Sequence, residues 1–166
     1  MDQPEYLYHG SPETQIEIFE PRAEGVRDKK EGPVVFGSPS RAFAAMFLVP
    51  SDDSWTTKSR IGDSYYHIIS DRERYLREDK GGAIYTLPSL TFVSDPTKGM
   101  GKGEWTSKAA VAPVKTEVFK SGLEAQKSLG VQICFVGTEE FREMKDLLRE
   151  RKYEEALAMI KGFKTE

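Results

Sequence analysis

The feature that most constrains the fold of this chain is the shortness of its apolar runs. Residues 34–36, 65–69, 83–87 and 131–136 are mostly apolar or aromatic, and glycine, proline or charged residues separate them. Short apolar runs bounded by turn residues are typical of β-strands. A chain of 166 residues has the usual length of one domain. We therefore expect one domain that contains several short strands.

Helical patterns occur between these strands and at the C-terminal end. Ser38 and Pro39 suit the cap and first position of a helix that extends to about Leu48. Apolar positions in 139–162 recur at helical spacing. Residues 50–63 are mostly polar, and we expect a loop there. The fold class is therefore expected to be α+β, with a domain over 1–137 and a helical extension over 138–166 packed on it.

Charge and composition exclude several classes of protein. The formal net charge is −3, from 24 Lys and Arg against 27 Asp and Glu, which argues against strong nonspecific nucleic-acid binding. The N-terminus has no apolar signal core, and no apolar run approaches the length of a membrane span, so we expect a cytoplasmic protein without a membrane partner. The single cysteine, Cys134, lies in an apolar run and is expected to be a buried core thiol, without a metal site.

Two histidines are present, and their surroundings differ. His67 lies inside an aromatic and aliphatic run, and we expect it on a half-exposed strand. His9 ends the first expected strand, Glu5 to His9, and Gly10 and Ser11 follow it. A glycine at that point lets a ligand approach the backbone closely.

Three segments together resemble the ADP-ribosyltransferases of the diphtheria-toxin and poly(ADP-ribose) polymerase type. The first is His9-Gly10-Ser11, at the end of a strand. In the second, Phe36 ends a strand, and Phe47 follows eleven positions later on a helix. The third begins with Glu104, which precedes Trp105 and an expected strand. The resemblance covers about residues 5 to 136 and depends on the order of the three segments.

The resemblance implies a fold of split antiparallel sheets around a cleft for NAD, which serves as a substrate. It implies that Glu104 is the catalytic glutamate and that His9 binds a ribose hydroxyl. Gly10 would offer backbone groups to the nicotinamide carboxamide, and Ser11 would contact the adenosine side. Phe36 and Phe47 would clamp the nicotinamide ring, and Ser38 lies in the turn that is assigned with them to the cofactor site. No metal is needed for this chemistry.

The sequence departs from the family at several positions. Phenylalanine replaces the usual tyrosine at both ring-stacking positions, which retains stacking but loses a hydroxyl group. Lys102 lies where the arginine- and asparagine-modifying branches carry Glu or Gln, in a Gly- and Lys-containing segment, 95–103, at the place of the acceptor-recognition loop. The acceptor is therefore open: protein, nucleic acid, a small molecule or water. Two other functions also stay open, a noncatalytic NAD or ADP-ribose binding module and an interaction protein acting through its C-terminal helices.

Overall fold

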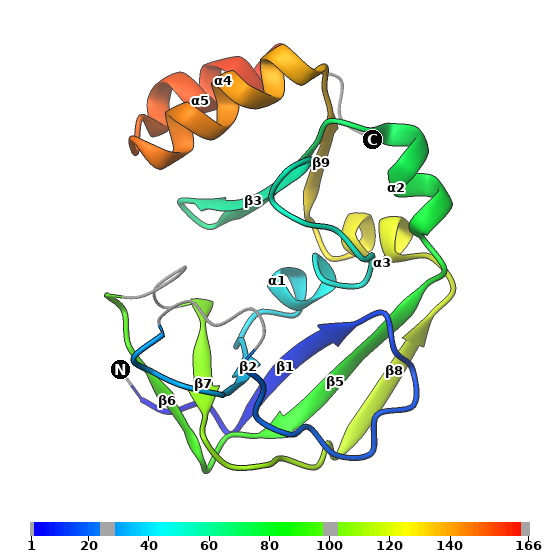
Figure 1. Ribbon diagram of the computed structural model, residues 1–166, viewed down its shortest axis with the longest axis vertical. Coiled ribbons are helices and arrows are strands. Elements are labelled where there is room, and N and C mark those ends of the chain that lie inside the picture. The colour runs from blue at the N-terminus through cyan, green and yellow to red at the C-terminus, as the bar shows by residue number, and fades with distance from the viewer. Residues whose placement is uncertain (1, 24–28, 98–102, 164–166) are drawn as a thin grey trace.

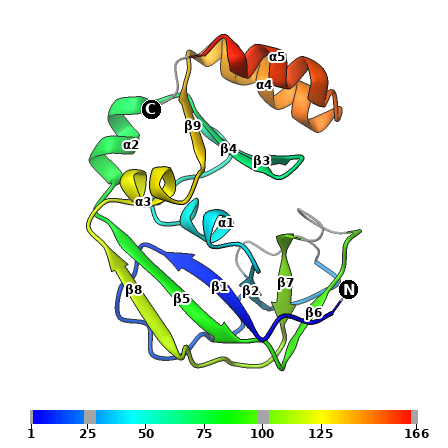
Figure 2. The same ribbon diagram turned by 180° about the vertical axis from the view of Figure 1, so that it is seen from behind.

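The computed structural model describes residues 2–23, 29–97 and 103–163. Helices and strands are interspersed along the chain, and the fold is α+β. Figures 1 and 2 show the arrangement in layers: two lower sheets, a middle layer that contains α1 and α3, an upper sheet, and the two C-terminal helices above it. The layers matter for function because the end of β1 meets α1 where the lower sheets and the middle layer join.

The two lower sheets are antiparallel. One has the order β1 (Tyr6–Ser11), β5 (Gly82–Pro88) and β8 (Lys115–Phe119), and the other has the order β2 (Val35–Gly37), β7 (Trp105–Ser107) and β6 (Phe92–Ser94). Tyr8 and Ser38 join them by exchanging two backbone hydrogen bonds, of 2.7 and 2.9 Å. Beyond this pair the two sheets separate, and β1 continues to Ser11 with β5 as its ladder partner.

The upper sheet contains the largest departure from the sequence-based expectations. β3 (Thr56–Ile61) pairs antiparallel with β4 (Ser64–Ile69), which pairs parallel with β9 (Gln132–Phe135). The prediction of a loop over 50–63 is therefore wrong for its second half. β3 is an edge strand whose side chains are mostly half-buried, so polar residues are tolerated on it and the ladder with β4 decides its structure.

The helix α1 is shorter than predicted and begins later. It covers Arg41–Ala45, and its cap is Ser40, whose hydroxyl group accepts a hydrogen bond from the backbone N–H of Phe43. The Ser38 hydroxyl group instead accepts from the N–H of Ser40, so it shapes the turn before the helix. The prediction of Ser38 as the cap is thus wrong by two positions.

The remaining helices pack beside α1 and over the outer face of the upper sheet. α2 (Arg72–Glu78) and α3 (Gly122–Ser128) pack with α1 around a cluster that includes Phe43, Tyr75 and Ile133. α4 (Thr138–Arg149) and α5 (Tyr153–Lys161) cover the other face of β4 and β9, where their apolar residues contact Tyr66, Ile68 and Cys134. Cys134 is fully buried, as predicted, and burial raises the pKa of its thiol to about 11. Among the helices of the described residues, none has the length and apolar character that crossing a membrane requires.

Candidate functional site

The end of β1 has an open backbone edge next to a closely packed helix. A methyl group added to Gly10 would lie 1.8 Å from the carbonyl oxygen of Ala44, so no larger residue fits against α1 here. Tyr8 directs its N–H and C=O to Ser38, and residues two apart in a strand direct these groups to the same side. The backbone N–H and C=O of Gly10 therefore lie along the edge of β1 that no longer pairs with the segment of β2.

His9 is held in a defined orientation by the neighbouring strand. Its Nδ1 atom lies 2.7 Å from the backbone oxygen of Phe36, and because a carbonyl oxygen can only accept, Nδ1 carries the proton. Its ring also packs against Phe19, at 4.6 Å between centroids. Burial, partly offset by the bond to Phe36, lowers the pKa of His9, and the Arg22 charge lowers it further. Nε2 of the neutral ring is then an acceptor for a hydroxyl group.

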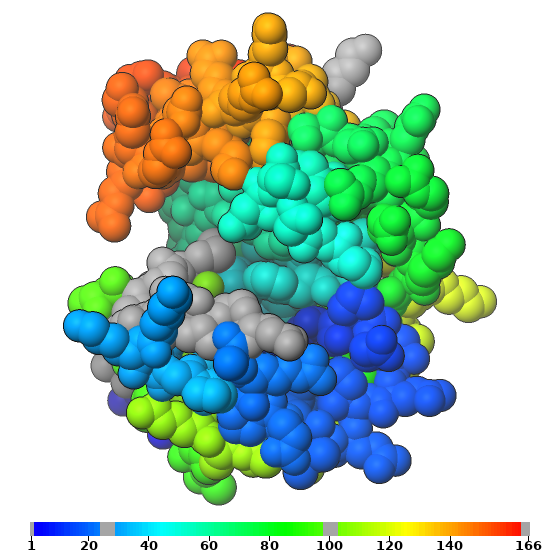
Figure 3. Space-filling model, viewed as in Figure 1, coloured from blue at the N-terminus to red at the C-terminus, as the bar shows by residue number. Residues whose placement is uncertain are grey.

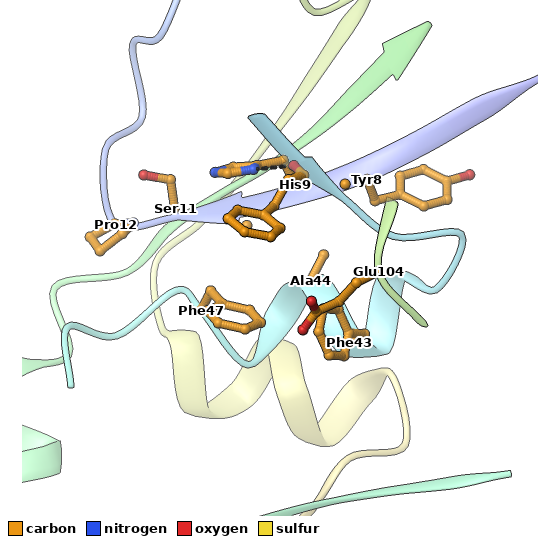
Figure 4. A pocket seen from close by; sticks show the side chains of 11 residues that line it. Tyr8, His9, Ser11, Pro12, Phe43, Ala44, Phe47 and Glu104 are labelled. Atoms are coloured by element: carbon orange, nitrogen blue, oxygen red, sulfur yellow. Dashed lines mark hydrogen bonds between the residues drawn. The ribbon is translucent and has the colours of Figure 1, made fainter. Parts of the chain in front are cut away.

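A cavity of about 390 Å³ lies where β1, β2, α1 and Glu104 meet. This volume falls in the range of small-molecule sites. Figure 4 shows Phe43 on α1 and Phe47 just after it at one side of the cavity, with His9 and Ser11 on β1 at the other. The lining is largely apolar and consists of Tyr8, His9, Gly10, Ser11, Pro12, Phe36, Gly37, Phe43, Ala44, Phe47 and Glu104.

Two of the aromatic residues that line the cavity were expected there from the sequence. Phe36 reaches it from the middle of β2, and Phe47 reaches it from the turn that follows α1. Phe47 is 41% exposed, and its ring lines the cavity, which leaves surface for a flat ligand to cover. Phe43 was not predicted as a site residue; its spacing of four from Phe47 on one helical segment is the signal that indicates it.

Glu104 supplies the carboxylate of the cavity. It directly precedes β7, which β2 separates from the end of β1. In Figure 4 its carboxylate points toward the space flanked by Phe43 and Phe47. A negative charge among apolar walls is suited to stabilise a positive charge that develops on a ligand.

The structure does not bring every predicted residue into this cavity. Ser38 is buried and does not line it; its backbone joins the lower sheets instead. Lys102 and most of the predicted acceptor loop, 95–103, lie outside the described residues. Ser11 lines the cavity, and its hydroxyl group also accepts a hydrogen bond from the N–H of Glu13.

His67 is not on a half-exposed strand, as the sequence suggested, but fully buried. Its Nδ1 lies 2.7 Å from the Oε1 atom of Gln126, whose amide nitrogen donates to Tyr75 and to the backbone of Gly122. Burial is the main cause that lowers the pKa of His67 to about 3, and the charge of Lys58 adds to it. This histidine belongs to the core.

A second cavity of about 210 Å³ adjoins the first and shares His9, Ser11 and Phe36 with it. Its other lining residues come from 13–35 and include Glu13 and Arg22, so it is more polar. Together the two cavities form a site in which an apolar compartment and a polar compartment meet at His9.

Within the described part of the chain, no cluster of His, Cys, Asp and Glu side chains is arranged to hold a metal ion. No protein-family model matches the chain, and neither a curated protein nor a solved structure is significantly similar to it. The chemistry of the site must therefore be argued from its own residues.

Proposed function

We propose that this protein binds NAD at the end of β1, cleaves the nicotinamide–ribose bond and transfers ADP-ribose to an acceptor. The observation that carries the proposal is the meeting of the Gly10 backbone edge, two aromatic rings and the Glu104 carboxylate in one cavity. These are the groups that the resemblance to ADP-ribosyltransferases assigns to NAD, and they come from three separate segments of the chain.

Each part of the site matches a part of the dinucleotide. The Gly10 N–H and C=O complement the oxygen and amide of the nicotinamide carboxamide, and Phe36 and Phe47 flank its flat ring. The Nε2 atom of His9 accepts a hydrogen bond from a ribose hydroxyl, since its Nδ1 is occupied by Phe36. The second cavity, with Arg22 and Glu13, supplies room for the rest of the ligand beyond His9.

Glu104 supports the bond-breaking step. When the bond from C1′ of the ribose to the ring nitrogen breaks, its electron pair stays on the nitrogen and nicotinamide leaves as a neutral base. The ribose gains oxocarbenium character, which the carboxylate stabilises. An acceptor lone pair then forms the new bond to C1′, and the acceptor loses its proton to Glu104 or to water.

The test is incubation of the purified protein with NAD, followed by mass analysis of nicotinamide, ADP-ribose and the protein itself. Glu104→Gln retains the size of the side chain but removes its charge. We expect turnover to fall on the order of a hundredfold with NAD affinity nearly unchanged, because the charge acts mainly on the transition state.

Glu124→Gln is the matched control, because Glu124 lies on α3 with a largely exposed side chain paired with Lys127. It should leave both quantities unchanged. NAD binding without any release of nicotinamide would replace the enzyme with a binding module of the same architecture. Absence of both binding and release at millimolar NAD would refute the proposal.

A further inference from the structure

Lys58 on β3 reaches toward the cavity from the upper sheet. Its Nζ atom lies over the Phe47 ring, 5.0 Å from the ring centroid, and 3.3 Å from the hydroxyl oxygen of Ser51. The strand β3 belongs to the upper sheet and Phe47 follows α1 in the middle layer, so this contact joins the upper sheet to the middle layer (Figure 1). The space-filling view shows this face of the molecule indented between the upper and lower parts (Figure 3).

The Lys58 side chain is half-buried, and its ammonium group has no close counter-ion among the described residues. Burial lowers the pKa of Lys58, and the charge of Asp53 acts in the opposite direction from a distance. Across the described ranges of the chain, no carboxylate lies within ion-pair distance of Nζ. The π face of Phe47 is therefore a principal partner of this cation.

The Phe47 ring thus contacts the Lys58 ammonium group and also lines the ligand cavity. Phe47 lines the cavity but Lys58 does not, which places the ammonium group outside the space that a ligand fills. We propose that Lys58, through its position over Phe47, makes the aromatic clamp prefer a neutral nicotinamide ring over the positively charged ring of NAD. This inference rests on the proposed function.

Electrostatics gives the direction of the effect. A pyridinium stacked on Phe47 would lie roughly 10 Å from Nζ, since stacked centroids are about 4.5–7 Å apart. Repulsion between two cations at that distance in a partly buried site changes affinity by about three- to tenfold. The repulsion disappears when the ring becomes neutral, while the new positive charge forms on the ribose beside Glu104. Lys58 therefore promotes departure of nicotinamide without touching the ligand.

The experiment compares two small probes that differ in charge, nicotinamide and 1-methylnicotinamide. Calorimetric titration gives the affinity ratio of the neutral to the cationic ring for the wild type, Lys58→Met and Lys58→Arg. We expect Lys58→Met to shift the ratio about three- to tenfold toward the cationic probe, and Lys58→Arg to retain the wild-type ratio. A purely structural loss of Phe47 support would lower both affinities alike and leave the ratio unchanged.

Arg60→Met is the matched control on the same strand, because Arg60 is two residues further along β3 and bonds to Gly62 and Asp63 instead. It should not change the ratio, although it removes the same net charge. If the wild type binds both probes and Lys58→Met leaves the ratio unchanged, the inference on Lys58 is wrong and the proposed function stands. If the wild type binds neither probe but binds NAD, the ring does not occupy a site beside Phe47 and the inference on Lys58 is wrong; if it also fails to bind or cleave NAD, the proposed function fails with it.

Discussion

The two histidines lie in two regions of the molecule that differ in how a polar side chain is buried and hydrogen-bonded. The cavity region comprises β1, β2, α1 and Glu104, and the packed region comprises β4, β9, α2 and α3. His9 lies in the cavity region, where one ring nitrogen bonds to a backbone carbonyl and the other lies beside a cavity. His67, in the packed region, is fully buried and bonds to a side chain that is itself bonded twice more.

These surroundings distinguish a ligand-binding residue from a structural one in this fold. In the packed region, Nδ1 of His67 is paired with Gln126 and the surrounding side chains form a closely packed cluster, so a change there acts on stability. In the cavity region, the backbone edge of Gly10 and the partly exposed ring of Phe47 line a cavity, so protein atoms do not cover them fully. Changes to side chains that face the cavity should act mainly on binding, whereas a side chain added at Gly10 would meet α1 and act on stability; the following predictions test this division.

The largest effect is expected for acidification acting on His67. Its pKa is about 3 in the folded protein against 6.5 for a free histidine, so the unfolded chain binds more protons between these values. Stability that is present above pH 6.5 is therefore lost as the pH falls toward 3, by about 1.4 kcal/mol per pH unit and on the order of 5 kcal/mol in total. Urea denaturation between pH 6.5 and 5 measures this slope before most carboxylates are protonated.

His67→Gln should be less stable at neutral pH but should show a flatter slope in that window. His9→Gln is the comparison: the pKa of His9 is also lowered by burial, so this variant should lose part of the slope, but less than His67→Gln, whose histidine has the larger shift. An unchanged slope in His67→Gln would mean that His67 is not the group that makes the packed region sensitive to acid.

The next largest effect is expected for a substitution at the contact between β1 and α1. Gly10→Ala places a methyl group against the backbone of Ala44, which cannot move as a flexible side chain can. We expect a loss of about 3 kcal/mol or more in the free energy of unfolding. Gly162→Ala is a suitable control, because its new methyl group would meet its nearest atom at an ordinary distance of 3.4 Å. Normal stability of Gly10→Ala would show that α1 can move away from β1.

The α+β fold class and several of the strands could be predicted from short-range sequence patterns, since apolar runs act locally, whereas the cap of α1 was placed two residues too early. The His9-Gly10-Ser11 segment, Phe36, Phe47 and Glu104 were grouped by their resemblance to a family, and the structure brings them to one cavity. β3 was missed because its residues are polar and its ladder with β4 decides its structure. The bonds of Gln126 to His67 and Tyr75 join distant segments, and no local pattern records such contacts.

A smaller effect is expected for substitution of Phe47, which should lower NAD affinity more than it lowers the stability of the fold. Phe47→Ala removes a ring that is 41% exposed, so the core loses less than it would at a buried position. We expect NAD affinity to fall by about 1–3 kcal/mol, the usual value of stacking between a base and an aromatic side chain. Calorimetry and thermal unfolding of the same sample compare the two quantities. Unchanged affinity in a folded Phe47→Ala protein would remove Phe47 from the site.

The smallest effect is expected for His9. His9→Gln loses a hydrogen bond to the ligand and should weaken NAD binding by about 1 kcal/mol, or roughly fivefold. Ser38→Ala is the control, because Ser38 lies outside the cavity although it was predicted to be part of the site. If Ser38→Ala weakens NAD binding as much as His9→Gln does, the assignment of His9 as ligand-facing and Ser38 as structural is wrong.

The parallel pairing of β4 with β9 has a consequence for how the chain is made. Tyr66 pairs with Gln132, so β4 leaves the ribosome long before its partner exists. Until β9 arrives, one edge of β4 is unpaired, and Tyr66 and Ile68 lack the cover of α4 and α5. Contacts between such distant segments form slowly, and an uncovered strand edge is a site of aggregation. Slow translation between β4 and β9 should therefore increase the demand of this protein for chaperones.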